Sequence, residues 1–109
     1  MVADVTIFSI EPDAMDGVIR HFQDSIAQAA AQQIGFSGML LLTDRHSNRA
    51  IAVLLWETKA ALLAATNSAG THINLRFAHL VSRVLEQANY DISVQVEITP
   101  QGHPHVRGI

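Results

Sequence analysis

Residues 36–57 read FSGMLLLTDRHSNRAIAVLLWE, and this stretch decides the fold. Two apolar runs flank the polar segment DRHSNR, which predicts a β-hairpin whose turn lies at Ser47 or Asn48. The second run, AIAVLLWE at 50–57, is apolar at both sets of alternating positions, as expected of a strand that is buried on both faces. A small sheet with helices on one side leaves its other face uncovered, so we expect a second copy of the chain to cover that face by symmetry.

The segment before the hairpin is predicted to be a strand followed by a helix. Residues 2–10, VADVTIFSI, are rich in β-branched and aromatic residues and therefore indicate a strand, which ends before Pro12. Apolar residues then recur every three or four positions up to about Gln33, which indicates a helix with Gly35 as its stop. The apolar positions of this helix are Met15, Val18, Ile19, Phe22, Ile26 and Ala29.

Three further elements are predicted after the hairpin. Residues 59–67 are rich in Ala and Leu and indicate a short helix, which the segment 68–71 interrupts. We expect a second helix from His72 to about Ala88, because apolar residues recur there with helical spacing. That stripe consists of Phe77, Leu80 or Val81, Val84 and Ala88. Residues 90–99 alternate apolar and polar side chains, which is typical of a strand with one polar face.

The predicted order of elements is β-α-β-β-α-β, which is the split βαβ or ferredoxin-like arrangement. We therefore expect an α+β domain over residues 1–99, with a four-stranded antiparallel sheet and helices on one face. Residues 100–109 are expected to form a C-terminal tail that is mobile or lies on a neighbouring chain.

Composition excludes several classes of protein. The 109 residues are 49% hydrophobic and 16% charged, which rules out a disordered chain and leaves apolar surface for a partner. The net charge is −3 and the seven Lys and Arg residues are scattered, which argues against binding to nucleic acid. No apolar run is long enough to span a membrane and no signal peptide is visible, so a cytoplasmic location is expected.

No motif predicts a metal centre, a nucleotide site or a catalytic triad. The chain has no cysteine, no G-x-S-x-G and no glycine-rich phosphate loop. His72 and His79 share a face of one predicted helix, but they lie two turns, roughly 10 Å, apart, which is too far to share one ion. His103 and His105 in the tail form at most a weak pair. We therefore expect no metal and no cofactor.

The residues around the hairpin resemble the antibiotic biosynthesis monooxygenase-like family. In that family a Gly-Phe-x-Gly element precedes the second strand and a Trp-Glu-Ser-x-x-Ala element follows the third. The matching residues here are Gly35, Phe36, Gly38, Trp56, Glu57, Thr58 and Ala61, with Thr58 in the place of Ser. These proteins are dimeric α/β barrels, so the resemblance implies a homodimer through sheet faces and agrees with the element order over residues 2–99.

The haem-degrading branch of this family is disfavoured. That branch resembles a pattern with an Asn on the first strand, a second Trp nine residues after the strand Trp, and a His ten residues further on. Aligned on Phe22 and Trp56, those places hold Thr6, Ala65 and Leu75. His72 lies three residues early for the histidine position.

The resemblance implies a cofactor-independent monooxygenase-like protein that binds a small aromatic ligand, of polyketide or quinol type, in a pocket between the sheet and the helices. An electron-rich phenolate reacts with oxygen directly, so the protein has to bind it, exclude water and help remove a proton. His72 is the candidate base at the mouth of this pocket. The candidate substrate-binding residues are Thr6, Phe8, Phe22, Trp56 and Phe77.

Two alternatives to an enzyme stay open at this point. The aromatic residues can simply fill the core, and the protein is then a non-catalytic dimeric ligand-binding or assembly module of the same fold. A ligand sensor is a lesser alternative. A cavity with at least two convergent polar side chains favours the enzyme, whereas a space filled by Leu, Phe and Trp favours the module.

Overall fold

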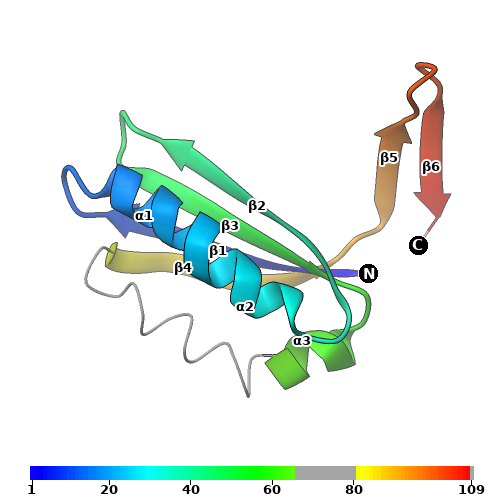
Figure 1. The fold of residues 1–109 in the computed structure, drawn as a ribbon, viewed down its shortest axis with the longest axis horizontal. Helices are drawn as coiled ribbons and strands as arrows, with labels where there is room; N and C mark the ends of the chain where they lie inside the picture. The colour runs from blue at the N-terminus through cyan, green and yellow to red at the C-terminus, as the bar shows by residue number, and fades with distance from the viewer. Residues whose placement is uncertain (66–80, 109) are drawn as a thin grey trace.

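The computed structural model describes residues 1–65 and 81–108, and its main feature is a four-stranded antiparallel sheet. The strands lie in the order β2-β3-β1-β4, so the first strand is central and the predicted hairpin forms one side of the sheet (Figure 1). The strands are β1 (Val2–Ile10), β2 (Phe36–Asp44), β3 (Arg49–Trp56) and β4 (Val81–Asp91). This order is that of a ferredoxin-like α+β fold, so the predicted fold class is confirmed. The expected dimeric α/β barrel stays a prediction.

One helical segment connects β1 to β2 and lies across one face of the sheet (Figure 1). It consists of α1 (Met15–His21), the π-helical turn η1 (Phe22–Ile26) and α2 (Ala27–Ala31). The sequence predicted a helix over this region, and the structure confirms it and adds the π-helical turn in the middle. Such turns are rare and occur frequently at functional sites.

The local turns follow from their residues. Asn48 has a φ of 56°, a left-handed conformation that Asn tolerates, and the predicted hairpin turn is thereby confirmed. After β3, the Oγ1 atom of Thr58 accepts a hydrogen bond of 3.0 Å from the backbone N–H of Ala61 and caps the short helix α3 (Lys59–Ala65).

The predicted helix from His72 to about Ala88 is wrong over residues 81–88, which belong to β4. The pairing of β4 with β1 explains the misleading periodicity. Ile10 pairs with Val81 and Phe8 pairs with Val84, with register shifts between Ile7 and Phe8 and between Ser9 and Ile10. Two core-side residues of this strand are therefore three positions apart instead of two, which imitates a helical spacing. The predicted helix start at residue 72 lies outside the described residues.

The predicted strand over residues 90–99 is also wrong in part, and part of the expected C-terminal tail forms a strand. β4 already ends at Asp91, and β5 (Val94–Ile98) pairs with β6 (Pro104–Gly108) in a separate two-stranded sheet. The turn between them is closed by a hydrogen bond of 2.7 Å from the N–H of Thr99 to the carbonyl oxygen of His103. We call the β5–β6 hairpin the arm, because it projects away from the main sheet (Figure 1). The expected division into a domain over 1–99 and a tail over 100–109 stays a prediction, although the arm crosses that boundary.

The core lies between the helical segment and the face of the sheet that it covers, which we call the inner face. Its buried members are Phe8, Ile10, Met15, Val18, Phe22, Ile26, Ala50 and Ala52. A second buried cluster joins β1, β3 and α3 at one end of the sheet, and it consists of Val2, Trp56, Leu62 and Ala65. The predicted helical and strand stripes therefore meet as expected.

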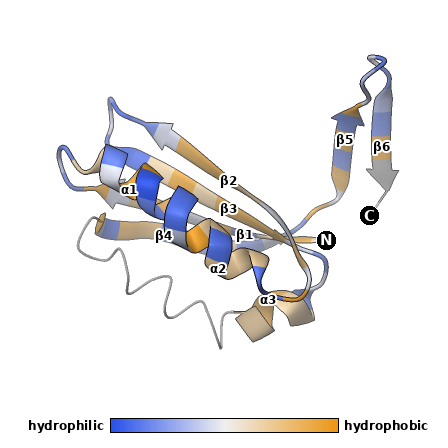
Figure 2. Cartoon of the chain, viewed as in Figure 1, coloured by the Kyte–Doolittle hydropathy of each residue, from blue (hydrophilic) through white to orange (hydrophobic). Residues whose placement is uncertain are grey.

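The opposite face of the sheet, which we call the outer face, is also apolar. By register it carries Val5 and Ile7 of β1 beside Val53 and Ile51 of β3. On the flanking strands, the outer-face residues Leu40, Leu42 and Tyr90 are exposed large hydrophobic side chains. Figure 2 shows the apolar colouring that runs along β2 and β3. Both faces of β3 are therefore apolar, as the sequence predicted.

Candidate functional site

A strip of polar side chains crosses the inner face where β1 and β4 meet. The register places Asp4 opposite Asn89 and Thr6 opposite Gln87, on the same side of β1 as the core residue Phe8. We call these four residues, Asp4, Thr6, Gln87 and Asn89, the polar strip. The helix-covered face of a sheet is ordinarily apolar, so a group of polar side chains there calls for an explanation.

Asp4 is the titratable member of the polar strip. Its side chain is half-buried, and burial raises the pKa of its carboxyl group, while a hydrogen bond from the side chain of Gln87 lowers the pKa by a smaller amount. The Oδ1 atom is buried and accepts no hydrogen bond in the structure over the residues it describes. A buried carboxyl oxygen without a donor is costly.

The polar strip is partly accessible from solvent, unlike the buried core residues of the inner face. Gln87 and Asn89 are exposed, and Asp4 and Thr6 are half-buried. Val84, which pairs with the buried Phe8, has an exposed fraction of 57%. Over the residues that the structure describes, the β4 side of the polar strip therefore contacts solvent.

The aromatic candidates lie in two separate places. Phe8 of β1 and Phe22 of η1 stack in the main core, with ring centroids 6.2 Å apart and planes inclined by 8°. Both are buried, so these rings fill space between the sheet and the helical segment. Trp56 lies in the second cluster, where Phe36 contacts it edge-on with centroids 5.3 Å apart. The Nε1–H group of Trp56 is buried and donates no hydrogen bond within the described chain.

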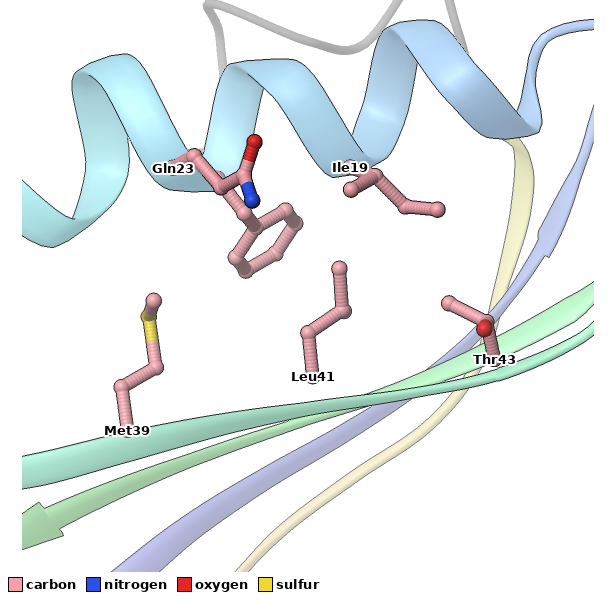
Figure 3. Close-up of a pocket in the computed structure, with 6 residues that line it drawn as sticks. Ile19, Gln23, Met39, Leu41 and Thr43 are labelled. Carbon is pink, nitrogen blue, oxygen red and sulfur yellow. The ribbon is translucent and has the colours of Figure 1, made fainter.

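A cavity of about 240 Å³ lies beside the main core, between the helical segment and the edge strand β2. Ile19 and Gln23 project into it from the helical side, and Met39, Leu41 and Thr43 project from β2 (Figure 3). Phe22 completes the lining. We call it the edge pocket. Two polar side chains, Gln23 and Thr43, reach it, and its volume is below the roughly 300 Å³ typical of sites for drug-sized ligands.

The structure brings together only part of the site predicted from the sequence. Thr6 belongs to the polar strip, Phe22 lines the edge pocket, and Phe8 stacks on Phe22 in the core. Trp56 lies in the other cluster. His72 and Phe77 lie outside the described residues. The role of these six residues in binding or catalysis stays a prediction.

Sequence reasoning missed Asp4 and its partner Gln87. The signal for Asp4 was present, because the alternation of β1 places it on the same side as Thr6 and Phe8, in the middle of an apolar strand. Gln87 could not be found, since its segment was assigned to a helix.

Two further searches of the described residues bear on the class of site. Over residues 1–65 and 81–108, no group of three or more His, Cys, Asp or Glu side chains is arranged to hold a metal ion. Within the same ranges, no helix is long and apolar enough to cross a membrane.

No protein-family model and no curated protein matches the sequence. Solved structures nevertheless share the fold. A proposed antibiotic biosynthesis monooxygenase from Deinococcus radiodurans is similar with a TM-score of 0.70 at 20% identity, over 91% of this chain and 99% of that one. MhuD, in a variant solved with two manganese protoporphyrin IX molecules bound per active site, gives a TM-score of 0.73 at 20% identity, over 89% and 99%.

A third similar structure is that of SnoaB, a cofactor-independent oxygenase from Streptomyces nogalater. Its TM-score is 0.65 at 21% identity, and the match covers 84% of this chain and 91% of that one. The fold implied by the sequence motifs is thus the fold of these proteins. At these identities the similarity establishes the fold and leaves the activity open.

Proposed function

We propose that this protein is a cofactor-independent monooxygenase that binds a small aromatic ligand, of polyketide or quinol type, between the sheet and the helices. The observation that carries the proposal is the partly accessible polar strip on a largely apolar inner face. Polar groups that converge beside aromatic residues are the usual composition of a site for an aromatic molecule with hydroxyl or carbonyl groups. The similarity in fold to SnoaB supports the same class of reaction.

The reaction class needs no group beyond the substrate and oxygen. In an anthrone, for example, a methylene carbon becomes a carbonyl carbon, one oxygen atom enters the product and the other leaves as water. The substrate supplies both the hydrogens and the electrons, so no external reductant is required. The contribution of the protein is to orient the substrate, exclude water and accept a proton.

The site residues are proposed as follows. Thr6 provides a hydroxyl group on the inner face, while Phe8, Phe22, Trp56 and Phe77 provide aromatic surface for shape and stacking. His72 is proposed as the base or hydrogen-bond partner at the mouth of the site. Phe22 also borders the edge pocket, so that pocket is the second place where a ligand could bind.

Oxygen consumption tests this proposal directly. Purified protein is incubated with a panel of anthrones and hydroxyquinols while dissolved oxygen is followed, and quinone formation is measured by absorbance. We expect protein-dependent uptake of about one oxygen molecule per molecule of quinone formed. Uptake no faster than in a heat-denatured control for every compound would contradict the proposal.

We further propose that the working form is a homodimer through the outer sheet faces. Two apolar surfaces support it, and the first is the outer face itself. The second is the arm, where the register places Val94, Val96 and Ile98 of β5 on one side with Val106 and Pro104 of β6. The four aliphatic residues among them are exposed large hydrophobic side chains. A lone two-stranded hairpin is marginal in water, so a second chain that covers it would stabilise it.

A non-catalytic dimeric binding or assembly module is the second candidate. It is favoured by the Phe8–Phe22 stack, because these rings are buried against each other and act as core. In that case ligands of the panel bind without oxygen uptake, or do not bind at all, and the dimer persists. The two candidates are therefore separated by the same oxygen measurement combined with a binding assay.

A further inference from the structure

We propose that Asp4 is the proton acceptor of the site, which leaves His72 the role of hydrogen-bond partner: the free carboxyl oxygen of Asp4 receives the hydroxyl group of the aromatic ligand and then takes the proton from it. This inference rests on the proposed function and deepens it. It names a residue that the family resemblance does not supply, and it directs the phenolic or enolic hydroxyl group of the ligand at β1.

The geometry gives one reason for this assignment. Asp4 lies on the inner face between Val2 and Thr6, and it pairs with Leu54 of β3 on one side and Asn89 of β4 on the other. Gln87 lowers the pKa of Asp4 through its side chain, whereas Oδ1 of Asp4 is buried and accepts no hydrogen bond within the described chain. Folding alone would be served better by an apolar side chain at this position.

The surroundings suit a group that gains a proton. By register, the inner-face residues of β1, β3 and β4 include no Lys, Arg or His side chain, and the other carboxylate among them is the exposed Asp91, opposite Val2. No cation from these strands is therefore present to hold Asp4 ionised. Burial raises the pKa of Asp4 and brings it nearer to that of a phenol, which favours proton transfer.

A second buried polar atom defines what else the ligand needs. Trp56 has an exposed fraction of 3%, and its Nε1–H donates no hydrogen bond within the described chain. Because Val2 pairs with Trp56 and Asp4 pairs with Leu54, Trp56 and Asp4 are diagonal neighbours, with Cα atoms about 7–8 Å apart in such a register. The inner face thus holds one buried acceptor and one buried donor that have no partner in the described chain, and a ligand with a hydroxyl and a carbonyl group, such as a hydroxylated anthrone, would supply both partners.

The step itself is a simple transfer. The O–H bond of the ligand breaks, the proton joins the Asp4 carboxylate to give the carboxylic acid, and the electron pair stays on the ligand oxygen as a phenolate. The phenolate is the form that reacts with oxygen. The proton returns to solvent from Asp4 after the product leaves.

The test uses binding as well as turnover. The variant is Asp4→Asn, which keeps the shape of the side chain and removes the charge, and the matched control is Asp24→Asn, which removes the same charge from an exposed site on η1. The probes are 1,8-dihydroxyanthraquinone and the unsubstituted anthraquinone. Affinity is measured by equilibrium dialysis, and quenching of the fluorescence of Trp56, the only Trp of the chain, reports whether the probe lies near it.

We expect Asp4→Asn to bind the dihydroxy probe about tenfold more weakly than the wild type, since a hydrogen bond to a charged group is stronger than one to a neutral amide. Binding of anthraquinone should be unchanged in both variants, and Asp24→Asn should match the wild type. If turnover is found, Asp4→Asn should lower kcat by ~10²–10⁴-fold.

The contrary results separate this inference from the proposed function. Equal affinity of wild type and Asp4→Asn for the dihydroxy probe overturns the role of Asp4 and leaves the proposed function standing. An equal loss in Asp24→Asn also overturns it, because the effect is then one of net charge. A wild type that binds neither probe and consumes no oxygen with the panel overturns both.

Discussion

A Cβ atom placed on Gly35 would lie 2.6 Å from the Cβ of Ala61, so the start of β2 and the helix α3 are in contact with no space for a side chain. The carbonyl oxygen of Gly35 also accepts a hydrogen bond of 2.8 Å from the N–H of Glu57. Thr58 caps α3, and Phe36 packs edge-on against Trp56. These are the residues on which the family resemblance rests. In this chain they hold a junction of two strands and a helix together, which explains why they indicate the fold better than the reaction.

Gly35→Ala is expected to destabilise the protein. Gly35 has a φ of +85°, a left-handed conformation that costs an Ala residue about 1–2 kcal/mol, and the contact with Ala61 adds to this. Gly102 has a nearly equal φ of +83° with nothing within 4 Å of an added Cβ, so Gly102→Ala isolates the conformational part. Urea unfolding of both variants should show a larger decrease in the free energy of unfolding for Gly35→Ala than for Gly102→Ala. Equal losses would show that the junction relaxes at no cost.

Asp13→Gly is expected to stabilise the protein by up to about 1 kcal/mol, because Asp13 has a φ of 66° and glycine adopts this conformation without a steric penalty. The greater freedom of glycine in the unfolded chain reduces the gain. Thermal unfolding measures the effect, and Asp13→Asn serves as the control that removes the charge but keeps a side chain. A lower melting temperature for Asp13→Gly would mean that the Asp side chain contributes more than its backbone strain costs.

Phe22→Ala should lower the free energy of unfolding by about 3–5 kcal/mol, because Phe22 is buried and stacks on Phe8, so its removal leaves a cavity in the core. Gln23→Ala, next to it on η1 and exposed, should change stability by less than about 0.5 kcal/mol. Chemical unfolding of the two variants checks this. A cost below about 1 kcal/mol for Phe22→Ala would contradict a role of its ring in holding the core together.

Asp4→Asn should be more stable than the wild type at neutral pH. Burial raises the folded-state pKa of Asp4 above its unfolded value of about 3.9, so ionised Asp4 destabilises the fold. Because the folded-state pKa is the higher one, the wild type keeps its full stability relative to Asp4→Asn below the unfolded pKa. It loses stability relative to that variant as the pH rises through the folded pKa. Melting temperatures should therefore converge at about pH 3 and diverge toward pH 7. A wild type that is more stable than Asp4→Asn at pH 7 would contradict the raised pKa.

Leu40→Glu should dissociate the proposed homodimer. Leu40 is on the outer face with an exposed fraction of 55%, and a charge buried there between two sheets would be unpaired. Leu63→Glu is the matched control, because Leu63 lies on α3 outside the sheet and has a similar exposed fraction of 48%. Light scattering should give twice the chain mass of 11.9 kDa for the wild type and the control, and the single mass for Leu40→Glu. A wild type at the single mass at micromolar concentration would contradict the dimer.

The sequence predicted the individual elements well where its periodicities were regular. β1, the helical segment, the hairpin and α3 all follow simple alternation or a three-to-four spacing, and the structure contains each of them. It failed at β4, because the register shifts against β1 give Val81 and Val84 a helical spacing within a strand. It also failed at β6, since the tail contains Pro104 and no alternating apolar run, and only its pairing with β5 makes it a strand.

The candidate site was predicted less well, for a related reason. Thr6 and Phe22 could be placed from the alternation of β1 and the stripe of the first helix. The sequence could not predict which aromatic residues contact one another. Phe8 and Trp56 lie on the same face of the sheet, yet they belong to different clusters. The partner of Asp4 comes from the strand that was assigned to a helix.

The root of the arm has a consequence for how this protein is handled. The N–H of Ile92 donates a hydrogen bond of 3.0 Å to the carbonyl oxygen of Met1. This bond holds Met1 at the point where the arm leaves the sheet (Figure 1). Any purification tag or fusion partner joined ahead of Met1 would emerge beside the arm and compete for the surface that a second chain is proposed to cover. The oligomeric state measured for a protein with such an addition would then depend on the tag as well as on the chain itself.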